Sequence, residues 1–539
     1  MQKIQGNIVD VFSEEIYPAE IKFDHGIITN INRVQKKGRY YILPGLVDAH
    51  IHIESSLLTP SRFAEVTVPH GTVATVSDPH EIANVLGIEG IDYLEKDGKN
   101  VPLKFFWTAP SCVPATPFET SGATLGPESI KELLNRSSVV SLGEVMNYPG
   151  VVNGDPTILK KINLAKAAGK PIDGHCPGLS GKDLKKYVAT GISTEHEAVT
   201  LTEAQEKAAL GMKIMVREGS SAKNLEDIIS VKGERFLVSD DKHPHDLLKG
   251  HLNVLLKKVV TLGPSPIEAI KMVSKNPILH YDLPVGLLRE GDPADFVLVK
   301  DLKNFRVVET WIEGVLVAKK GKALFSVNPV KRRNTIKLEK TFSHNFEIRS
   351  KEERPKVRII KVIKNQIYTE ELQEKMVAYE GKLLPNIEKD LLKIATVERY
   401  GHGNIGLGIV HGFGLKTGAI ASSVAHDSHN IIVVGTNAED MASAVNSIKA
   451  LGGGLVVVKK EKLKASLALP VAGLMSTRKA STVAKALKKL HKVTKKLGCV
   501  LPSPFMTLSF LALLVIPKLK LSDQGLFDGE KFAFVDLIV

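Results

Sequence analysis

Short apolar runs alternate with longer amphipathic stretches between about residues 45 and 280. Eight of these runs are bounded by polar or turn-forming residues, a pattern that predicts β-strands separated by helices. The runs are GLVDAHIHI, TVATVSDP, LKFFWTAP, VVSLGEVM, KPIDGHC, ISTEHE, KIMVREG and RFLVSD. Eight strands alternating with helices over this length predict a (β/α)8 barrel of the TIM type, an α/β fold whose active site lies at the carboxyl ends of the strands.

The chain on both sides of this region has a different pattern, with short strands and closely spaced turns. Residues 1–44 contain GNIVDVF, EIKFDHGIITNI and YYILPG, and Gly26 lies between two apolar stretches, which predicts a hairpin. The later segment VGLLREGDPADFVLVK and its continuation look similar. We therefore expect residues 1–44 and 281–326 to form one small β domain flanking a barrel of residues 45–280.

The rest of the chain predicts a further domain. Residues 327 to about 360 are polar and basic, which is typical of a linker. Beyond it, the strand-like runs IIVVG and GLVVVKK lie among glycine-rich turns and lysine-rich helical patterns. We expect residues 335–539 to form an additional α+β domain at the C-terminal end.

Candidate metal ligands stand at the ends of the predicted barrel strands. His50 and His52 end the first strand, and side chains two apart on a strand point to the same face. A lone His-X-His pair is weak evidence, but four more residues occupy equivalent positions on other strands: Glu144, His175, His196 and Asp240. Imidazole and carboxylate groups suit zinc, iron or manganese, so this set predicts a site for two divalent ions.

This arrangement resembles the amidohydrolase superfamily, which carries His-X-His on strand one and a bridging Lys or Glu on strand four. Its members also have a histidine on each of strands five and six and an aspartate on strand eight. The resemblance implies that Glu144 bridges a binuclear centre and that a carbamylated lysine is not used. The segment GLLREGDPADFVLV is similar to the C-terminal half of the superfamily's small β domain.

Other segments resemble the adenine deaminases within this superfamily. They are HIESSLLTP, SDPHEIANVLG, DGHCPGLSG, HDSHNIIVVG and AGLMS, and the C-terminal region resembles the extra domain of those enzymes. The purine-nucleoside deaminases are less similar, because they carry His-Ala-Gly-Glu where this chain has HCPG. The cytidine-deaminase type needs P-C-x-x-C, which the sequence lacks.

The resemblance implies a reaction of adenine with water that gives hypoxanthine and ammonia, as in purine salvage, with a metal-activated hydroxide attacking the ring. Asp240 would act as the acid and base, Glu144 as the metal bridge, and His196 would polarise the ring or steady the intermediate. Mn2+ or Fe2+ is favoured and Zn2+ is possible. Glu54 and His80 contact substrate or belong to polar surface loops, and the same two readings hold for Glu81.

Two further polar segments have open interpretations. Residues 426–430, HDSHN, precede an apolar strand and are either an exposed turn or a segment that closes the substrate pocket or holds an additional ion. In the second interpretation, Asp427 and His429 contact substrate. Arg217 and Glu218, at the end of the seventh strand, either pair with each other or touch substrate.

Composition narrows the possible partners and location. The chain has 72 Lys+Arg against 59 Asp+Glu, but the densest basic stretches, residues 331–340 and 485–496, contain no Phe, Tyr or Trp to stack bases. We therefore expect no nucleic-acid partner. The three cysteines form no CxxC pair, and the N-terminus lacks a signal-peptide pattern, so we expect a cytoplasmic protein without a membrane span. The family resemblance implies a homo-oligomer.

Three alternatives remain at this point. The chain could be another amidohydrolase that acts on a cyclic amide or a different aminated heterocycle, since the metal ligands alone fit both. It could be an inactive barrel that serves as a binding protein, although the presence of all six predicted ligands argues against this. Nucleic-acid binding is the third and weakest.

Overall fold

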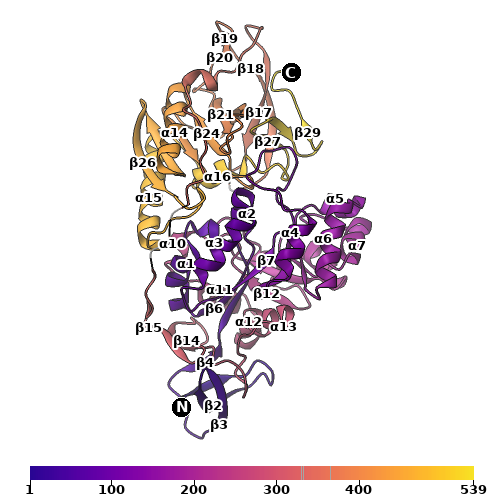
Figure 1. Cartoon of the computed structure of the whole chain (residues 1–539), viewed down its shortest axis with the longest axis vertical. Helices are drawn as coiled ribbons and strands as arrows, with labels where there is room; N and C mark the ends of the chain where they lie inside the picture. The colour runs from indigo at the N-terminus through magenta and orange to yellow at the C-terminus, as the bar shows by residue number, and fades with distance from the viewer. Residues whose placement is uncertain (329–330, 332, 365) are drawn as a thin grey trace. The chain divides into compact units, whose positions relative to one another are not determined.

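The computed structural model describes residues 1–539 except 329, 330, 332 and 365, and the described chain divides into two compact units (Figure 1). Unit 1 contains Met1–His80, Ile91–Cys112 and Leu125–Val330. Unit 2 contains Glu81–Gly90, Val113–Thr124 and Lys331–Val539. No helix among the described residues is both long and apolar enough to cross a membrane.

The barrel of unit 1 confirms the predicted fold class. Five parallel strands pair in the order β5-β6-β7-β8-β9, and three more pair as β10-β11-β12, all within residues that the structure describes. Ile51 and Asp240 form a parallel bridge that joins the last strand to the first. The strands are β5 (Leu46–Ile51), β6 (Thr72–Ser77), β7 (Lys104–Ala109), β8 (Val139–Val145), β9 (Ile172–Gly174), β10 (Thr194–Glu195), β11 (Lys213–Arg217) and β12 (Arg235–Val238).

The helices that follow these strands begin at residues suited to helix starts. Proline occupies the first position of α1, α4 and α6, where its missing N–H costs nothing. The Asp155 carboxylate accepts from two backbone N–H groups at the start of α6. The helices up to residue 281 are η1 (Ile53–Ser56), α1 (Pro60–Thr67), η2 (Val68–His70), α2 (His80–Leu86), α3 (Ile88–Gly98), α4 (Pro127–Leu134), α5 (Tyr148–Asn153), α6 (Pro156–Ala167), α7 (Gly181–Ala189), α8 (Leu201–Ala209), α9 (Leu225–Ile228), α10 (Pro244–Leu247), α11 (Leu252–Thr261), α12 (Pro266–Met272) and α13 (Lys275–Tyr281).

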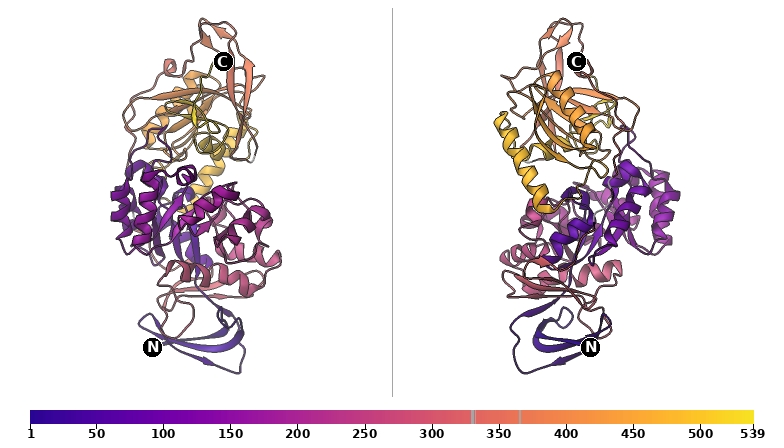
Figure 2. Two further views of the ribbon diagram at one scale, coloured as in Figure 1. Left: turned by 90° about the vertical axis from the view of Figure 1, so that its right-hand side faces the viewer. Right: turned by 60° about the vertical axis from the view of Figure 1, so that its left-hand side comes forward.

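A separate sheet in unit 1 contains strands from both sides of the barrel sequence, in the order β16-β15-β14-β13-β4-β1-β2-β3. Its indigo N-terminal strands form a curved ribbon in both views of Figure 2. Gly26 has a φ of +81° and forms the turn of the β2–β3 hairpin, as predicted. The strands are β1 (Gln2–Val9), β2 (Ile16–Asp24), β3 (Ile27–Arg33), β4 (Tyr41–Pro44), β13 (Phe296–Val299), β14 (Val307–Ile312), β15 (Val315–Lys319) and β16 (Lys322–Ala323).

Unit 2 is built on a mixed sheet with the order β18-β17-β22-β21-β24-β23-β25-β26. The helix α14 buries its apolar face against this sheet around Met441, Val445 and Ile448. The remaining elements are η3 (Ser343–Phe346), β17 (Lys356–Val362), β18 (Thr369–Lys375), β19 (Ala378–Tyr379), β20 (Lys382–Leu383), β21 (Leu392–Val397), β22 (Ile405–His411), β23 (Ala419–Ser422), β24 (Ile431–Gly435), α14 (Ala438–Leu451), β25 (Gly454–Lys459), β26 (Lys462–Ala468), α15 (Ala480–Lys496), α16 (Pro504–Phe510), β27 (Leu519–Ser522), β28 (Gly525–Asp528) and β29 (Ala533–Phe534).

The linker predicted at 327 to about 360 is wrong for much of its length, while residues 329, 330 and 332 lie outside the described part. Phe346 is fully buried in the core of unit 2. Thr341 exchanges two hydrogen bonds with Asn446, of 3.0 and 2.8 Å. The prediction rested on the polar composition of the segment and gave no weight to its few apolar residues. Burial of Phe346 in the core packs the segment against the sheet.

Candidate active site in the barrel of unit 1

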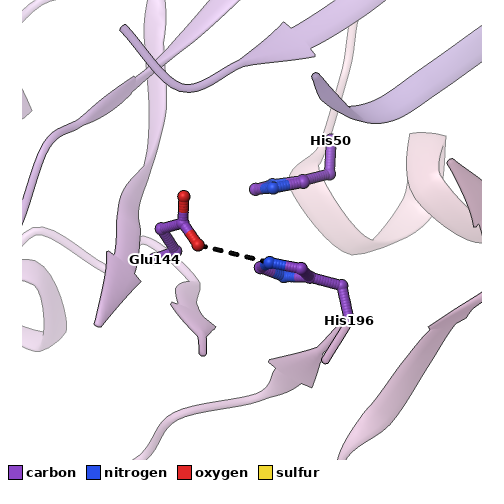
Figure 3. A group of neighbouring side chains, drawn as sticks. All are labelled: His50, Glu144 and His196. Carbon is purple, nitrogen blue, oxygen red and sulfur yellow. Dashed lines mark ion pairs between the residues drawn. The ribbon is translucent and has the colours of Figure 1, made fainter. Parts of the chain in front are cut away.

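The barrel brings the six predicted ligands together at the carboxyl ends of its strands. His50 is the second-to-last residue of β5 and His52 comes directly after the strand, and both imidazoles are at most 5% exposed. Their rings lie edge to face, 4.9 Å apart. His196 stacks on His50 at 4.2 Å, so the histidines form one contiguous buried cluster (Figure 3).

Glu144 lies at the centre of this cluster and faces different histidines with each of its oxygens. Its Oε1 is 3.3 Å from Nε2 of His52. Its Oε2 is 2.6 Å from Nδ1 of His175 and 3.2 Å from Nε2 of His196, the contact that Figure 3 marks with a dashed line. A carboxylate divided in this way between two groups of imidazoles has the position expected of a bridging ligand.

Asp240 closes the opposite side of the cluster. Its Oδ1 lies 3.2 Å from Nε2 of His52 and 3.6 Å from Nε2 of His50. Its φ of +52° is a left-handed conformation that aspartate tolerates better than most residues. Backbone hydrogen bonds between Asp240 and the ends of β5 hold it there, from its own N–H to the His50 carbonyl and from the His52 N–H to its carbonyl.

The donor atoms of this cluster fit divalent cations. The Nδ1 of His52 donates to the Asp78 carbonyl at 3.1 Å, which leaves the lone pair of Nε2 facing both carboxylates. The buried Nε2 of His50 faces Asp240 but forms no hydrogen bond with any residue that the structure describes. A buried polar atom without a hydrogen bond needs an explanation, and a cation shared by these histidines and carboxylates supplies one.

Electrostatics keeps both carboxylates ionised. Burial alone would raise the pKa of Glu144, but the facing imidazoles of His175 and His196 hold that pKa well below its ordinary value. Burial opposes ionisation of Asp240 in the same way, and the Arg217 guanidinium holds the pKa of that carboxyl well below its ordinary value. The site therefore offers anionic oxygen ligands at neutral pH.

Arg217 and Glu197 are supporting residues whose roles the sequence did not indicate. Arg217 donates to Oδ2 of Asp240 at 2.9 Å and pairs with Glu197 through both of its terminal nitrogens. Glu197 also approaches Nε2 of His196 at 3.3 Å. Of the two interpretations given for Arg217 and Glu218, pairing with each other is wrong, since Glu218 pairs with Lys258 at 3.0 Å. Contact with substrate remains a prediction.

Asp78 is another supporting residue that sequence reasoning missed. Its Oδ2 accepts the Glu144 backbone N–H at 3.0 Å, and its Oδ1 accepts the backbone N–H of His80 at 3.2 Å. Nδ1 of His80 also lies 3.3 Å from Oδ1 of Asp78. Its position just after β6, equivalent to the ligands on the other strands, was a signal that could have identified it.

Two candidate substrate residues in unit 1 are buried. His80 is 4% exposed, and its Nδ1 lies 3.5 Å from Oε1 of Glu144. Glu54 is also 4% exposed and lies in η1, directly after His52. The interpretation of Glu54 and His80 as surface-loop residues is therefore wrong, and the same holds for Glu81, which is 3% exposed.

The remaining candidates lie together in unit 2. Residues 426–430 are each at most 5% exposed, so the interpretation of HDSHN as an exposed turn is wrong. Nδ1 of His426 lies 2.7 Å from Oε1 of Glu81, and Nε2 of His429 contacts Oε2 of the same carboxylate. Asp427 lies close enough to Glu119 to help burial raise the pKa of that carboxyl to about 8.

Two family models match the chain. The one described as "Amidohydrolase family" matches residues 41–317, and the one described as "Adenine deaminase C-terminal domain" matches residues 366–533. Proteins named "Adenine deaminase" from Methanosphaera stadtmanae and Methanothermobacter thermautotrophicus are each 48% identical to this chain, over 99% of both lengths. The chain belongs to the adenine deaminase family. Membership confirms the resemblance found in the sequence, including the family-specific C-terminal domain.

The β-aspartyl dipeptidase of Fervidobacterium islandicum is 16% identical to this chain, with a TM-score of 0.44 over 60% of this chain and 97% of the other.

Proposed function

We propose that the chain catalyses the hydrolytic deamination of adenine to hypoxanthine and ammonia, with the reaction in the barrel of unit 1. The observation that carries the proposal is the convergence of all six predicted ligands around Glu144. The substrate is supported by full-length similarity to proteins named adenine deaminase. The same similarity disfavours the alternative of an amidohydrolase with a different heterocyclic substrate.

The groups that would hold a divalent pair are His50, His52, Glu144, His175, His196 and Asp240. Their imidazole and carboxylate donors suit Mn2+ or Fe2+, which we favour, and also Zn2+. When bound, such cations lower the pKa of a water molecule towards neutrality and so supply a nucleophile. Glu144 is the proposed bridge because each of its oxygens faces different histidines.

Asp240 is proposed to take the proton from the attacking water and to deliver it to the ring or to the departing amine. Arg217 donates to its Oδ2, and this contact directs Oδ1 towards the histidines. The carboxylate is thus ionised and fixed in one orientation before the reaction begins. A general base that is already ionised and oriented costs no reorganisation during proton transfer.

The substrate ring needs hydrogen-bonding partners near these ligands. His80 and Glu54 lie shortly after the ends of β6 and β5, respectively, and are buried. We propose that Glu54 accepts a ring N–H and that His80 and His196 polarise the ring as charge develops on it. Substrate contact by Asp427 and His429, one of the two interpretations of HDSHN, remains a prediction, as does substrate contact by Glu81.

The test is a substrate panel with purified, Mn2+-loaded protein. Ammonia release is measured with adenine, adenosine, guanine, cytosine and a cyclic amide. Adenine should react far faster than adenosine, because a site built for the free base has no room for ribose on N9. Comparable rates on adenosine, or activity confined to the cyclic amide, would overturn the proposal.

The proposed activity places the protein in purine salvage. A cytoplasmic location is proposed with it, supported by the unpaired state of Cys112, Cys176 and Cys499. We also propose a homo-oligomer without nucleic-acid or membrane partners. Light scattering coupled to gel filtration tests the assembly, and a monomer mass would contradict it.

A further inference from the structure

A second group of buried metal-ligand side chains lies entirely within unit 2. Glu81 comes from the first turn of α2, and His426 and His429 come from the segment before β24. The three side chains are at most 5% exposed, and their ligand-type atoms all lie within 4.8 Å of one another. None of the three belongs to the barrel's ligand set.

We propose that Glu81, His426 and His429 bind a divalent metal ion, separate from the ions proposed for the barrel. One carboxylate and two imidazoles are a donor set that suits Fe2+, Mn2+ or Zn2+. Nδ1 of His426 and Nε2 of His429 approach different oxygens of Glu81. The ligand-type atoms of the three side chains thus lie close enough together for each to contribute one donor to a shared ion.

The orientation of His429 supports coordination. Its Nε2 contacts Oε2 of Glu81, but among the described residues it has no partner with the geometry of a hydrogen bond. Nε2 of His50 combines the same two features in the barrel, where it faces Asp240 without a hydrogen bond. A ring nitrogen that lies near a carboxylate oxygen without hydrogen-bond geometry can share a cation with that oxygen.

The backbone holds His429 in an unfavourable conformation. Its φ is +54°, in the left-handed region that disfavours a residue with a side chain. The N–H of His429 donates to the Ala425 carbonyl at 2.7 Å, which closes a tight turn. Asp240 in the barrel has a φ of +52°. Such conformations concentrate at functional sites because the surroundings must impose them.

The surroundings of the group favour a cation. The ring of His426 stacks on Phe510 at 4.8 Å, which covers that side with apolar surface. Asp427 lies 3.9 Å from Nδ1 of His426, and Glu119 lies close to Asp427. The carboxylates of Glu81 and Asp427 thus both lie near His426, and a divalent cation would compensate their negative charge.

A competing arrangement without metal uses the same side chains. The Ala425 N–H donates to Nδ1 of His429 at 3.2 Å, which places the proton of a neutral ring on Nε2, facing Glu81. In that case the group is a hydrogen-bonded network, and a cation must displace this proton to reach Nε2. The two arrangements differ in the metal content of the protein.

The experiment counts metal ions in the full-length chain. Metal-free protein is loaded with Mn2+, freed of excess metal by gel filtration and analysed for metal per chain. With the pair proposed for the barrel, the wild type should retain about three ions and His429→Gln about two. Glu81→Gln should lose the same ion, and circular dichroism shows whether each variant is folded.

Two controls separate this site from the barrel. His402→Gln removes an imidazole of unit 2 that is 64% exposed, and it should retain as much metal as the wild type. Glu144→Ala should lose barrel metal and still retain the ion held by Glu81 and the two histidines. Equal metal content in the wild type, Glu81→Gln and His429→Gln would overturn the proposal.

The two proposals fail in different ways. Wild-type protein that deaminates adenine with about two ions per chain would contradict the site in unit 2 and leave the proposed function intact. Protein that retains the ion sensitive to His429→Gln but does not deaminate adenine would contradict only the proposed function.

Discussion

The two units each bury histidines around carboxylates, but they assemble these groups in different ways. In unit 1 the ligands come from the ends of strands β5, β8, β9, β10 and β12, and strand pairing alone brings those ends together. In unit 2 the group combines Glu81, in a helix, with His426 and His429, in a turn far along the chain. The regular architecture makes the first group recognisable in a sequence, whereas the second depends on one long-range packing arrangement.

Support around the ligands also differs. In the barrel, Asp78 accepts the backbone N–H of Glu144, and Arg217 holds one oxygen of Asp240. In unit 2, the two imidazoles contact the Glu81 carboxylate directly, one at each oxygen. We therefore expect substitutions in the barrel to have the larger effects on the reaction, and the following predictions test this ranking.

The largest effect is expected for Glu144→Ala. The variant should lose at least one metal ion, because it removes the carboxylate that faces four imidazoles, those of His52, His80, His175 and His196. We expect kcat to fall by about a thousandfold or more, which corresponds to a loss of roughly 4 kcal/mol of transition-state stabilisation. Elemental analysis and steady-state kinetics measure both. The control Glu128→Ala, at an exposed position on α4, should match the wild type.

Asp240→Asn should separate metal binding from catalysis. The amide keeps an oxygen that can face the histidines, but it cannot accept a proton as a carboxylate does. We expect metal content to fall less than kcat, which should drop by about a hundredfold to ten-thousandfold. Full activity in this variant would contradict the role of Asp240 in proton transfer.

Arg217→Met tests the support of Asp240. The change leaves Glu197 and Asp240 buried without their cation, and breaking a buried ion pair costs about 3–5 kcal/mol. Both the melting temperature and kcat should fall, and Arg217→Lys should restore part of each. A variant with unchanged kcat and only a lower melting temperature would show that Arg217 stabilises the fold without positioning the base.

A smaller effect is expected for the segment HDSHN of unit 2. Asp427→Ala and His429→Ala should each lower the deamination rate by about tenfold, or roughly 1.4 kcal/mol. Wild-type rates in both point variants, with folding confirmed by circular dichroism, would exclude the segment from the reaction.

The smallest effect concerns stability and pH. Burial and Asp427 raise the pKa of Glu119 from 4.5 to about 8, so the folded state keeps a proton that the unfolded state loses. The free energy of unfolding of the wild type therefore decreases progressively as the pH rises from 4.5 to about 8. Glu119→Gln should gain stability over the wild type between pH 5 and pH 8, as measured by denaturation at several pH values. A difference in the free energy of unfolding between Glu119→Gln and the wild type that does not change with pH would contradict the raised pKa.

The sequence predicted the barrel and its ligands because both follow from local patterns. Each strand is a short apolar run, and each ligand stands where its run ends, as in SLGEVM and STEHEA. Glu197 was missed because it is adjacent to a ligand and looks like an ordinary loop residue. Its role depends on Arg217, which comes from the next strand and reaches it across the barrel rim.

The arrangement in unit 2 could not be predicted in the same way. Residues 81–90 and 113–124 interrupt the barrel sequence, yet they pack with residues 331–539. No apolar periodicity marks this change of unit. The polarity of HDSHN argued correctly against a core strand, but its burial follows from contacts with Glu81, more than 300 residues earlier in the chain.

The most direct test of the central claim measures deamination and metal content together. Metal-free wild-type protein is titrated with Mn2+ while ammonia release from adenine is followed. Activity should be absent at the start, rise with the first equivalents and reach a plateau, and Glu144→Ala should remain inactive throughout. Deamination by metal-free protein, or a Glu144→Ala variant that follows the wild-type curve, would contradict a metal-dependent reaction centred on Glu144.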